Sequence, residues 1–340
     1  MHNNYIIDLT SASLAPICIF VYNRPQHTEK MLKSLMSNPL FEESEVFVFA
    51  DGPKENAGAD DLAKINDVRK LFEPLKERKN VFFRFSDKNL GLTTSIVSGI
   101  TEIVNQFGKI IVIEDDLELS SGFLKYMNDA LNLYENEERV MHIGGYMAPH
   151  NLNLPDTFFL KAPTIWGWGT WKRAWDKFEV NASVLLEKIE KTFGKNFAFK
   201  LDVNGTYNYT KQLKDIASGK LDTWDIQWAT SVYLYSGLCL HPSISLSRNN
   251  GFDGSGVHCY PSGIYEKQKI GNSTTVNKEK VVISSLGETA LMNFHIAKTK
   301  LTFSEQISSI YHKLAAMLPA NVKLGVKSFY KKANPIKTSK

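Results

Sequence analysis

The first part of the chain alternates short apolar runs with longer stretches of helical periodicity. Four β-branched or aromatic runs, each ended by polar residues, are typical of buried strands; they span residues 15–25, 45–53, 80–89 and 109–119. The apolar spacing that follows them favours helices over residues 28–36, 61–75, 90–107 and 122–136. This alternation predicts an α/β fold with a mainly parallel sheet and helices on both faces.

After about residue 140 the alternation fades. Short strand-like pieces with glycine turns occur at residues 139–149 and 157–169, and helical spacing returns at residues 174–199, 204–218 and 225–235. Residues 260–285 show no regular pattern. We therefore expect one domain over residues 1–260, with halves at about 15–140 and 141–260, followed by a helical C-terminal extension over residues 261–340.

The composition is that of a globular protein. Of 340 residues, 43% are hydrophobic and 22% are charged, which allows a sizeable core. The net charge of +4 does not indicate a nucleic-acid partner. The 3 cysteines lack metal-ligand spacing, which favours a reducing compartment. No apolar stretch reaches the ~18 to 20 residues that a membrane-spanning helix needs.

Polar side chains follow the ends of all four early strands. They are Tyr22-Asn23-Arg24, Asp51-Gly52, Asp87-Lys88-Asn89 and Glu114-Asp115-Asp116. Ligands of parallel sheets bind outside the carboxyl ends of the strands. We therefore expect a binding crevice along this edge.

The three adjacent acids Glu114, Asp115 and Asp116 suggest a cation site. Their mutual repulsion is costly unless a positive charge relieves it. Mg²⁺ and Mn²⁺ favour carboxylate oxygens and bridge one or two of them to substrate phosphates. The position after a buried strand favours this interpretation over a solvated acidic turn. The acids alone also fit a kinase-like or nucleotidyl-transfer protein.

The segment after the first strand contains no glycine. P-loop proteins and nucleotidyltransferases use a glycine-rich loop there to bring backbone N–H groups to phosphates, so both classes are disfavoured. Tyr22 and Arg24 suit stacking on, and charge contact with, a nucleoside diphosphate. Asp51 is either an acceptor for a base or ribose, or the residue that forms the turn before Gly52.

Several motifs occur in the order found in glycosyltransferases of the GT-A fold. IFVYNRP, FADG, DKNLGL and VIEDDLELSSGFLKYM resemble the nucleotide-binding half of the N-acetylglucosaminyltransferase I type and related bacterial sugar transferases. FFLKAPTIWGWGTWKRAW, LDTWDIQW and ISLSRNNGFDGSGVH resemble later segments of that family. The resemblance covers roughly residues 15–260, which would make this the catalytic domain.

The resemblance implies a metal-dependent, inverting transfer of a sugar from a nucleotide diphosphate donor, such as UDP-GlcNAc, to a hydroxyl of a glycan or lipid-linked glycan. It implies that Asp116 binds Mn²⁺ or Mg²⁺ and that Asp225 is the general base. Contacts with the donor are expected from Tyr22, Arg24, Asp51, Lys88, Asn89, Gly91, Glu114, Asp115, Trp168 and His258.

The residues by themselves leave alternatives for the base and for the histidine. Asp225 precedes a helical pattern, and an acid in a first helical turn is favoured by the helix dipole alone. Asp222 is the rival base. His258 in GFDGSGVHC is either an ordinary loop histidine or a ligand of metal or phosphate.

Four tryptophans between residues 166 and 175 combine packing and binding potential. Trp171 and Trp175 are four apart on one predicted helical face, and we expect them in the core. Flat aromatic faces also suit sugars and bases. Trp166 or Trp168 is therefore the expected site residue.

The C-terminal extension is amphipathic and basic. Apolar residues from Ile307 to Leu318 share a helical face, and lysines follow from Lys323 to Lys340. Such an end suits peripheral contact with an anionic membrane surface; the alternative is a helix packed on the domain with a solvated tail. With no N-terminal anchor and few cysteines, we expect a bacterial cytoplasmic enzyme of surface polysaccharide synthesis, for lipopolysaccharide or capsule.

The sequence leaves two other functions open. A sugar-nucleotide nucleotidyltransferase would share the acids, but the chain lacks the glycine-rich loop of that class. A non-catalytic carbohydrate-binding protein would suit the aromatic residues but not the carboxylate run.

Overall fold

The structure is a computed structural model that describes residues 13–254, 265 and 268–300. The chain divides into two compact units, Met1–Met292 and Asn293–Lys340, and the elements below belong to the first unit. His258 and the lysine cluster from Lys323 onward lie outside the described residues, so the expectations for them stay predictions.

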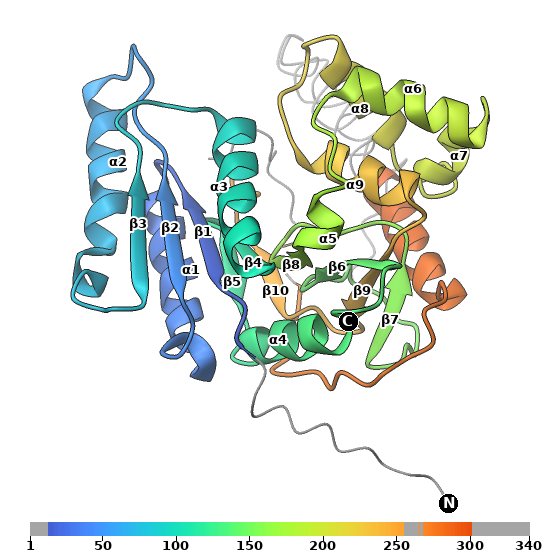
Figure 1. Ribbon diagram of the computed structural model, residues 1–340, viewed down its shortest axis with the longest axis horizontal. Coiled ribbons are helices and arrows are strands. Elements are labelled where there is room, and N and C mark those ends of the chain that lie inside the picture. The colour runs from blue at the N-terminus through green and yellow to red at the C-terminus, as the bar shows by residue number, and fades with distance from the viewer. Residues whose placement is uncertain (1–12, 255–264, 266–267, 301–340) are drawn as a thin grey trace, which may run out of the picture. The chain divides into compact units, whose positions relative to one another are not determined.

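The elements of the first unit follow one another along the chain as shown in Figure 1. In chain order they are β1 (Ile17–Val21), α1 (Pro25–Met36), η2 (Pro39–Phe41), β2 (Val46–Ala50), α2 (Ala59–Leu71), η3 (Glu73–Leu75), β3 (Val81–Phe85), α3 (Leu92–Phe107), β4 (Lys109–Glu114), β5 (Leu117–Leu119), α4 (Phe123–Leu133), β6 (Val140–Gly144), β7 (Thr157–Leu160), β8 (Trp168–Trp171), α5 (Lys172–Trp175), α6 (Ala182–Phe193), α7 (Phe197–Leu201), α8 (Tyr209–Ala217), α9 (Asp225–Leu234), β9 (Leu238–Pro242) and β10 (Ser247–Asn249).

Eight strands form one central sheet in the order β3-β2-β1-β4-β8-β6-β9-β7. The first four strands are mutually parallel, and β6 pairs parallel with β9. The strands β8 and β7 pair antiparallel with their neighbours. The predicted α/β fold, with a mostly parallel sheet between helices, is confirmed.

Alternate residues of the central strands point to opposite faces of the sheet, and each face has its own helices. Ile17 and Ile19 of β1 share a core cluster with residues of α1, α2 and α4. Cys18 and Phe20 of the same strand share another with residues of α3, α5 and α9. Because both faces of β1 and β2 are buried, these two strands are apolar throughout and not alternating.

The predicted strand over residues 109–119 is two strands. The chain turns at Asp115 and Asp116, between β4 and β5. The strand β5 then leaves the central sheet and pairs antiparallel with β10. A small separate ribbon therefore carries the residues that follow the acidic motif.

The predicted helix over residues 174–199 is three helices, α5, α6 and α7. Asn181 starts α6, because its side chain accepts hydrogen bonds from Ser183 N at 3.0 Å and Val184 N at 3.2 Å. Gly194, with φ of 74°, ends it. Among the described residues, no helix has the length and apolar character to cross a membrane.

Candidate active site

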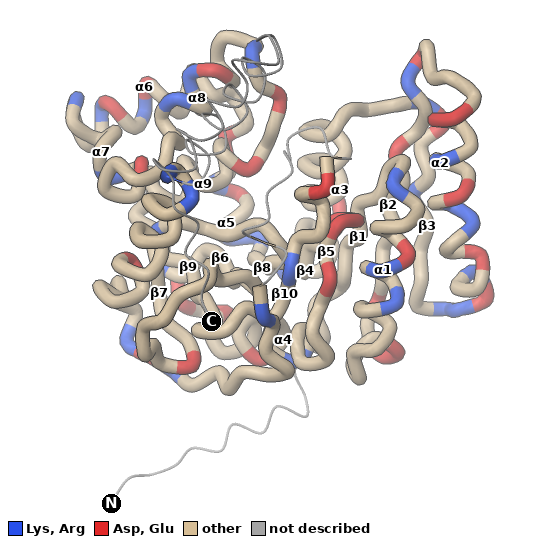
Figure 2. Tube along the Cα trace, turned by 180° about the vertical axis from the view of Figure 1, so that it is seen from behind, with Lys and Arg blue, Asp and Glu red and all other residues tan. Residues whose placement is uncertain are grey.

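The polar ends of the early strands converge, as the sequence predicts. Arg24 directly precedes α1 at the end of β1, and Asp115 and Asp116 follow β4. Because β1 and β4 are adjacent parallel strands, these ends lie at one edge of the sheet. Figure 2 shows acidic segments where the chain passes from β4 into β5, beside the start of α1.

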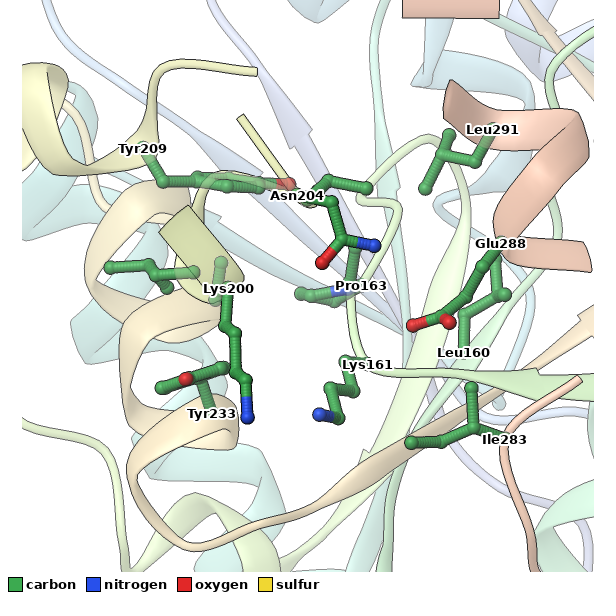
Figure 3. A pocket seen from close by; sticks show the side chains of 14 residues that line it. Leu160, Lys161, Pro163, Lys200, Asn204, Tyr209, Tyr233, Ile283, Glu288 and Leu291 are labelled. Atoms are coloured by element: carbon green, nitrogen blue, oxygen red, sulfur yellow. The ribbon is translucent and has the colours of Figure 1, made fainter. Parts of the chain in front are cut away.

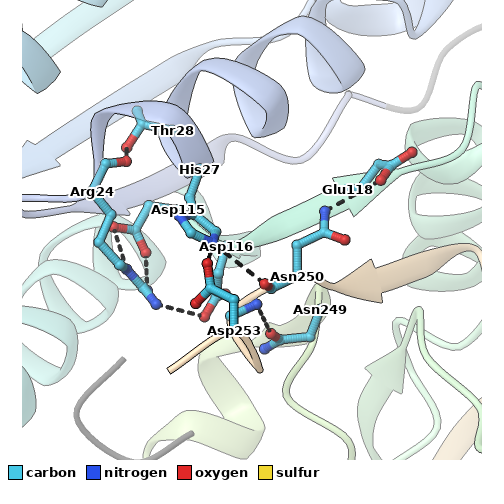
Figure 4. Close-up of polar contacts among 10 residues, drawn as sticks. Arg24, His27, Thr28, Asp115, Asp116, Glu118, Asn249, Asn250 and Asp253 are labelled. Carbon is cyan, nitrogen blue, oxygen red and sulfur yellow. Dashed lines mark hydrogen bonds and ion pairs between the residues drawn. The ribbon is translucent and has the colours of Figure 1, made fainter. Parts of the chain in front are cut away.

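Arg24 is held between two buried carboxylates (Figure 4). Its Nε donates to Asp115 Oδ2 at 3.2 Å, and its Nη2 donates to Asp115 Oδ1. Its Nη1 lies 3.1 Å from Asp116 Oδ2. The side chains of Asp115 and Asp116 are 6% and 9% exposed. The guanidinium thus provides part of the positive charge that the acidic run requires.

Glu114 adds a third carboxyl group beside this single guanidinium. Burial, followed by the charges of Asp116 and Asp115, raises the pKa of Glu114 well above its usual range. Burial also raises the pKa of Asp116, while Arg24 lowers it. One guanidinium faces three carboxyl groups, which favours the arrival of a further cation.

Asp116 stays the predicted ligand of a divalent cation, for which substrate oxygens and water would have to supply the other ligands. Within the described part of the chain, no group of three or more His, Cys, Asp or Glu side chains is placed to hold a metal. Mg²⁺ typically takes one or two protein carboxylates and completes its shell with phosphate oxygens and water. The carboxylates present suit that mode and do not form a complete protein cage.

The β5–β10 ribbon ties the segment over residues 247–253 to the acidic motif. Asn250 N donates to the backbone oxygen of Asp116 at 2.8 Å. Arg248 Nη2 and Asn250 Nδ2 donate to Glu118 Oε2 at 2.5 Å and 3.2 Å. These contacts fix the residues that follow Asp116 against the 247–253 segment.

Only a glycine fits beside Asp116 in this segment. A Cβ atom on Gly251 would lie 2.5 Å from Asp116 Oδ2 and 3.2 Å from Arg24 Nη1. His27 binds the same segment from α1, since its Nε2 lies 3.2 Å from Asp253 Oδ2 and 3.3 Å from the backbone oxygen of Asn250. The segment therefore passes directly over the carboxylate that is predicted to bind metal.

Sequence reasoning missed His27, Glu118 and Asn250. A signal for His27 was available, because it follows Arg24 by three residues at a predicted helix start, and such residues share a face. Glu118 and Asn250 are more than 130 residues apart in sequence. Nothing in their local spacing indicates that they meet.

Asp51 anchors the loop between β3 and α3. Its carboxylate accepts four hydrogen bonds at 2.8 to 3.2 Å, from Gly52 N, Leu90 N, Gly91 N and Asn89 Nδ2. Those are all the acceptor positions that a carboxylate offers. The turn-forming interpretation of Asp51 describes this geometry, and a nucleotide contact stays a prediction.

The other predicted donor contacts near Asp51 differ in exposure. Lys88 is exposed, and Tyr22 and Asn89 are half-buried. Burial, followed by the charges of Asp61 and Asp51, raises the pKa of Tyr22. Tyr22 therefore lies in the electrostatic field of the Asp51 loop.

Asp225 lies at the first position of α9 and is half-buried. Thr223 Oγ1 donates a hydrogen bond to Asp225 Oδ1. The charge of Asp225 contributes to the raised pKa of Glu114, which places Asp225 within electrostatic reach of the acidic motif. The rival, Asp222, is exposed and accepts a hydrogen bond from Thr93 Oγ1 at 2.7 Å.

Trp168 does not lie at a binding surface. Its side chain is fully buried and stacks on Trp224, with ring centroids 5.4 Å apart. A residue without exposed surface cannot contact a donor, so the expected donor contact is corrected. Trp171 and Trp175 lie in the core, as predicted. Trp166 is half-buried and is the member of the four with accessible surface.

No protein-family model and no curated protein sequence matches this chain. Solved structures with a similar arrangement include TarS 1-349 of S. aureus, at 13% identity and a TM-score of 0.37 over 68% of this chain and 59% of that one. The mannosyltransferase PcManGT from Pyrobaculum calidifontis, in complex with GDP-Man and Mn²⁺, matches at 6% identity. Its TM-score is 0.33, over 66% of this chain and 72% of that chain. GalNAc-T7 with UDP, GalNAc and Mn²⁺ matches at 9% identity. Its TM-score is 0.41, over 67% of this chain and 42% of that chain.

The chain thus spans 59% of the TarS structure and 42% of the GalNAc-T7 structure. All three TM-scores are below 0.5, and the identities are below 25%. These likenesses support no conclusion about the activity of this chain.

Proposed function

We propose that this chain is a glycosyltransferase of the GT-A fold that moves a sugar from a nucleotide diphosphate donor to an acceptor hydroxyl. One observation carries the proposal. Arg24, Asp115 and Asp116 form a charged cluster at the carboxyl edge of the parallel strands, and Asp225 lies within electrostatic reach of Glu114. A donor at this edge would have cationic, anionic and basic groups around its reacting bond.

In the proposed donor complex, Tyr22 and Arg24 contact the nucleoside diphosphate. Arg24 is placed to exchange part of its pairing with Asp116 for a phosphate oxygen, since guanidinium groups bind both anions in the same fork geometry. Glu114 and Asp115 contact the sugar and ribose. The 247–253 segment, tied to His27 and Glu118, closes the donor from the other side.

Asp116 is the proposed ligand of Mn²⁺ or Mg²⁺. Such a cation, when bound between Asp116 and the diphosphate, would neutralise charge on the leaving phosphate. Three carboxyl groups that face one guanidinium are the feature of this chain that supports its binding.

Asp225 is the proposed base of an inverting transfer. The acceptor oxygen attacks the anomeric carbon as the bond from that carbon to the diphosphate oxygen breaks, and the acceptor proton passes to a carboxylate oxygen of Asp225. Thr223 would orient that carboxylate through its hydrogen bond to Oδ1. Trp166 is proposed to offer an aromatic face near the reacting sugar.

The finer identity of the reaction rests on the sequence motifs. We propose a UDP-sugar, such as UDP-GlcNAc, as donor and a glycan or lipid-linked glycan as acceptor. The proposed setting is the bacterial cytoplasm, in surface polysaccharide synthesis, with peripheral membrane contact through the basic C-terminus. We propose that the catalytic domain, expected over residues 1–260, corresponds to the first unit, Met1–Met292.

A thermal-shift screen of nucleotide sugars with and without Mn²⁺ tests donor binding. We expect a UDP-sugar to raise Tm by on the order of 5 °C at a hundredfold excess over Kd, and only with metal. The Asp116→Asn variant should lose the metal-dependent part. Equal stabilisation with and without metal, or an unchanged shift in Asp116→Asn, would remove Asp116 from the metal site.

The two candidate bases are separated by matched variants. Asp225→Asn should lower transfer by at least about 10²-fold and leave donor binding largely intact, because general-base catalysis typically contributes about 10² to 10⁴. Asp222→Asn should retain transfer. Initial rates and donor titrations of both variants give the answer, and the opposite pattern would move the base role to Asp222.

A further inference from the structure

A pocket lies away from the acidic motif, in the later part of the first unit (Figure 3). Its volume is about 130 Å³. The polar groups around it belong to Lys161, Lys200, Asn204, Tyr209, Tyr233 and Glu288. Pockets that enclose a whole drug-sized ligand measure roughly 300 to 1,000 Å³. This pocket therefore suits one sugar ring or one charged substituent.

Two lysines at this pocket have no carboxylate partner among the described residues. Neither Lys161 nor Lys200 forms an ion pair with any residue that the structure describes. Figure 3 shows both amines directed into the space beside Tyr233, with the Glu288 carboxylate entering from the opposite side. Lys161 Nζ lies 6.0 Å from the centre of the Tyr233 ring. Two ammonium groups beside an aromatic face favour an anion with a ring attached.

The backbone at the pocket adopts an uncommon conformation. Val203 and Asn204 have φ of 50° and 53°, followed by Gly205 at 75°. A β-branched residue rarely takes positive φ, and such backbone is often found at binding sites. The turn is closed by a hydrogen bond from Gly205 N to the backbone oxygen of Phe199 at 3.0 Å. It places Asn204 at the rim of the pocket.

The pocket shares a helix face with the proposed base. Ala229 and Tyr233 line the pocket, and Asp225 precedes them at intervals of four residues on α9. Residues four apart are neighbours on a helix surface. At 1.5 Å per residue, these positions lie about 6 and 12 Å from Asp225 along the axis. An acceptor hydroxyl at Asp225 would leave its neighbouring sugar residue within reach of the pocket.

We propose that this pocket binds an anionic substituent, a carboxylate or a phosphate, on the acceptor saccharide of the proposed transfer reaction. Lys161 and Lys200 hold the anion, and Tyr233 packs against the ring. Asn204 and Glu288 bind hydroxyl groups of the same sugar. The enzyme would thereby select acidic acceptors over neutral ones. That the bound saccharide is an acceptor rests on the proposed function. Binding of the anionic saccharide itself does not require catalysis.

The test measures binding of three monosaccharides to the full chain by saturation-transfer NMR and calorimetry. Glucuronic acid represents a carboxylate, glucose 6-phosphate a phosphate, and glucose the neutral case. We expect at least one of the two acids to bind at least about tenfold more tightly than glucose, as expected for a charge-assisted hydrogen bond. Whichever acid binds more tightly identifies the substituent.

Matched variants assign the binding to the two lysines. The double variant Lys161→Gln/Lys200→Gln should bind the preferred acid at least about tenfold more weakly. Lys195→Gln makes the same kind of charge change at an exposed lysine outside the pocket and should bind like the unaltered chain. Equal binding of glucose and both acids, or unchanged binding in the double variant, overturns the proposal.

Donor binding in the same preparations separates the two proposals. A donor-induced thermal shift without acid binding supports the proposed transferase function and rejects the pocket as an anion-binding site. Acid binding without any donor-induced thermal shift supports the pocket as a site for anionic saccharides and rejects the proposed transferase function. If both are present, the double variant should raise KM for an acidic acceptor without changing donor binding.

Discussion

At the scale of single residues, Arg24 connects the two halves of the candidate site. Its place after the first strand predicts contact with a diphosphate. In the structure its three nitrogens contact Asp115 and Asp116. The same side chain can therefore hold the acidic motif in position and later bind phosphate.

Replacing Arg24 should destabilise the fold. Arg24→Met leaves two buried carboxylates without their partner, which typically costs about 3 to 5 kcal/mol. The raised pKa of Asp116 would rise further, so the loss should be largest at neutral pH and smaller as the pH falls. Urea unfolding at pH 7 and pH 5 measures both effects.

Arg84→Met is the control for this change. Arg84 Nε pairs with Glu102 Oε1 at 2.9 Å, and both side chains are more than 40% exposed. Exposed pairs contribute about 0 to 1 kcal/mol. Equal effects of the two variants would mean that the Arg24 pairing is not a buried, cooperative contact.

Which residues converge is predictable from the sequence, but their burial is not. Strand ends placed Arg24 and Asp116 together because parallel strands end at one edge. Trp166 and Trp168 could not be distinguished by their spacing. Trp168 falls in β8, whose burial depends on pairing with β4 and β6. That pairing is a long-range property with no local signal.

At the scale of elements, the close contact between the β2 end and the β3–α3 loop shapes the edge of the site. A Cβ atom on Gly52 would lie 2.5 Å from backbone atoms of Lys88. Asp51 then bonds Leu90 and Gly91 from the same turn. The Asp-Gly pair predicted a turn, while the approach to residues 88–91 emerges only from the paired strands.

Gly52→Ala should disrupt this loop. The new methyl group meets rigid backbone, so we expect a loss of about 1 to 3 kcal/mol in unfolding free energy, as for overpacked sites. Donor-induced thermal shifts should fall as well. Denaturant unfolding and the donor screen measure both.

Gly58→Ala provides a matched control at a glycine with open space. No atom lies within 4 Å of a Cβ at Gly58, and its φ of −74° is ordinary. We expect a loss of about 1 kcal/mol at most, because Gly58 is the N-cap of α2 and alanine is less favourable than glycine there. If the two alanine variants behave alike, close packing at Gly52 is not what fixes the loop.

Most helices and strands followed from periodicity, but interruptions did not. The turn at Asp115 divides one apolar run into β4 and β5, because the chain leaves the sheet to pair with β10. The helix over 174–199 is broken where Asn181 and Gly194 cap α6. Both breaks occur at residues with known cap or turn preferences.

At the scale of the whole molecule, two buried histidines make the stability of the folded core depend on pH. Burial and the charge of His241 lower the pKa of His142 to about 3, and burial lowers that of His241 to about 4. Trp228 Nε1 donates to His142 Nδ1 at 3.2 Å, which requires that nitrogen to be unprotonated. The folded state therefore holds the His142 ring neutral, and burial favours the neutral form of His241.

The contribution of these two histidines to stability should fall as the pH falls below about 6.5, the ordinary pKa of histidine. In that range the unfolded chain binds protons that the folded chain excludes, so the contribution is complete above that pH and decreases toward the folded pKa values. At pH 5 the loss is about 2 kcal/mol per histidine. Urea unfolding between pH 7 and pH 5 measures the slope.

Variants test whether the buried histidines cause this pH dependence of the unfolding free energy. His142→Gln should reduce the pH dependence, whatever its effect on absolute stability. His150→Gln, at a half-buried position outside the pair, should keep it. A difference in unfolding free energy between pH 7 and pH 5 that is the same in His142→Gln as in the unaltered chain would contradict a buried neutral His142.

The central sheet shows both what sequence predicts of the whole fold and where it fails. The parallel order of β1 to β4 follows from alternating strands and helices. The insertion of β8 between β4 and β6 does not, because it joins segments far apart in sequence. The pocket lined by residues between Leu160 and Leu291 could not be predicted from the sequence for the same reason.

The most direct test of the proposed activity is product analysis after incubation with UDP-GlcNAc and other nucleotide sugars in the presence of Mn²⁺. We predict slow release of free nucleoside diphosphate, accelerated by an acceptor saccharide and lost in Asp116→Asn. Formation of pyrophosphate, or tight saccharide binding with no turnover that is unaffected by Asp116→Asn, would contradict a glycosyltransferase.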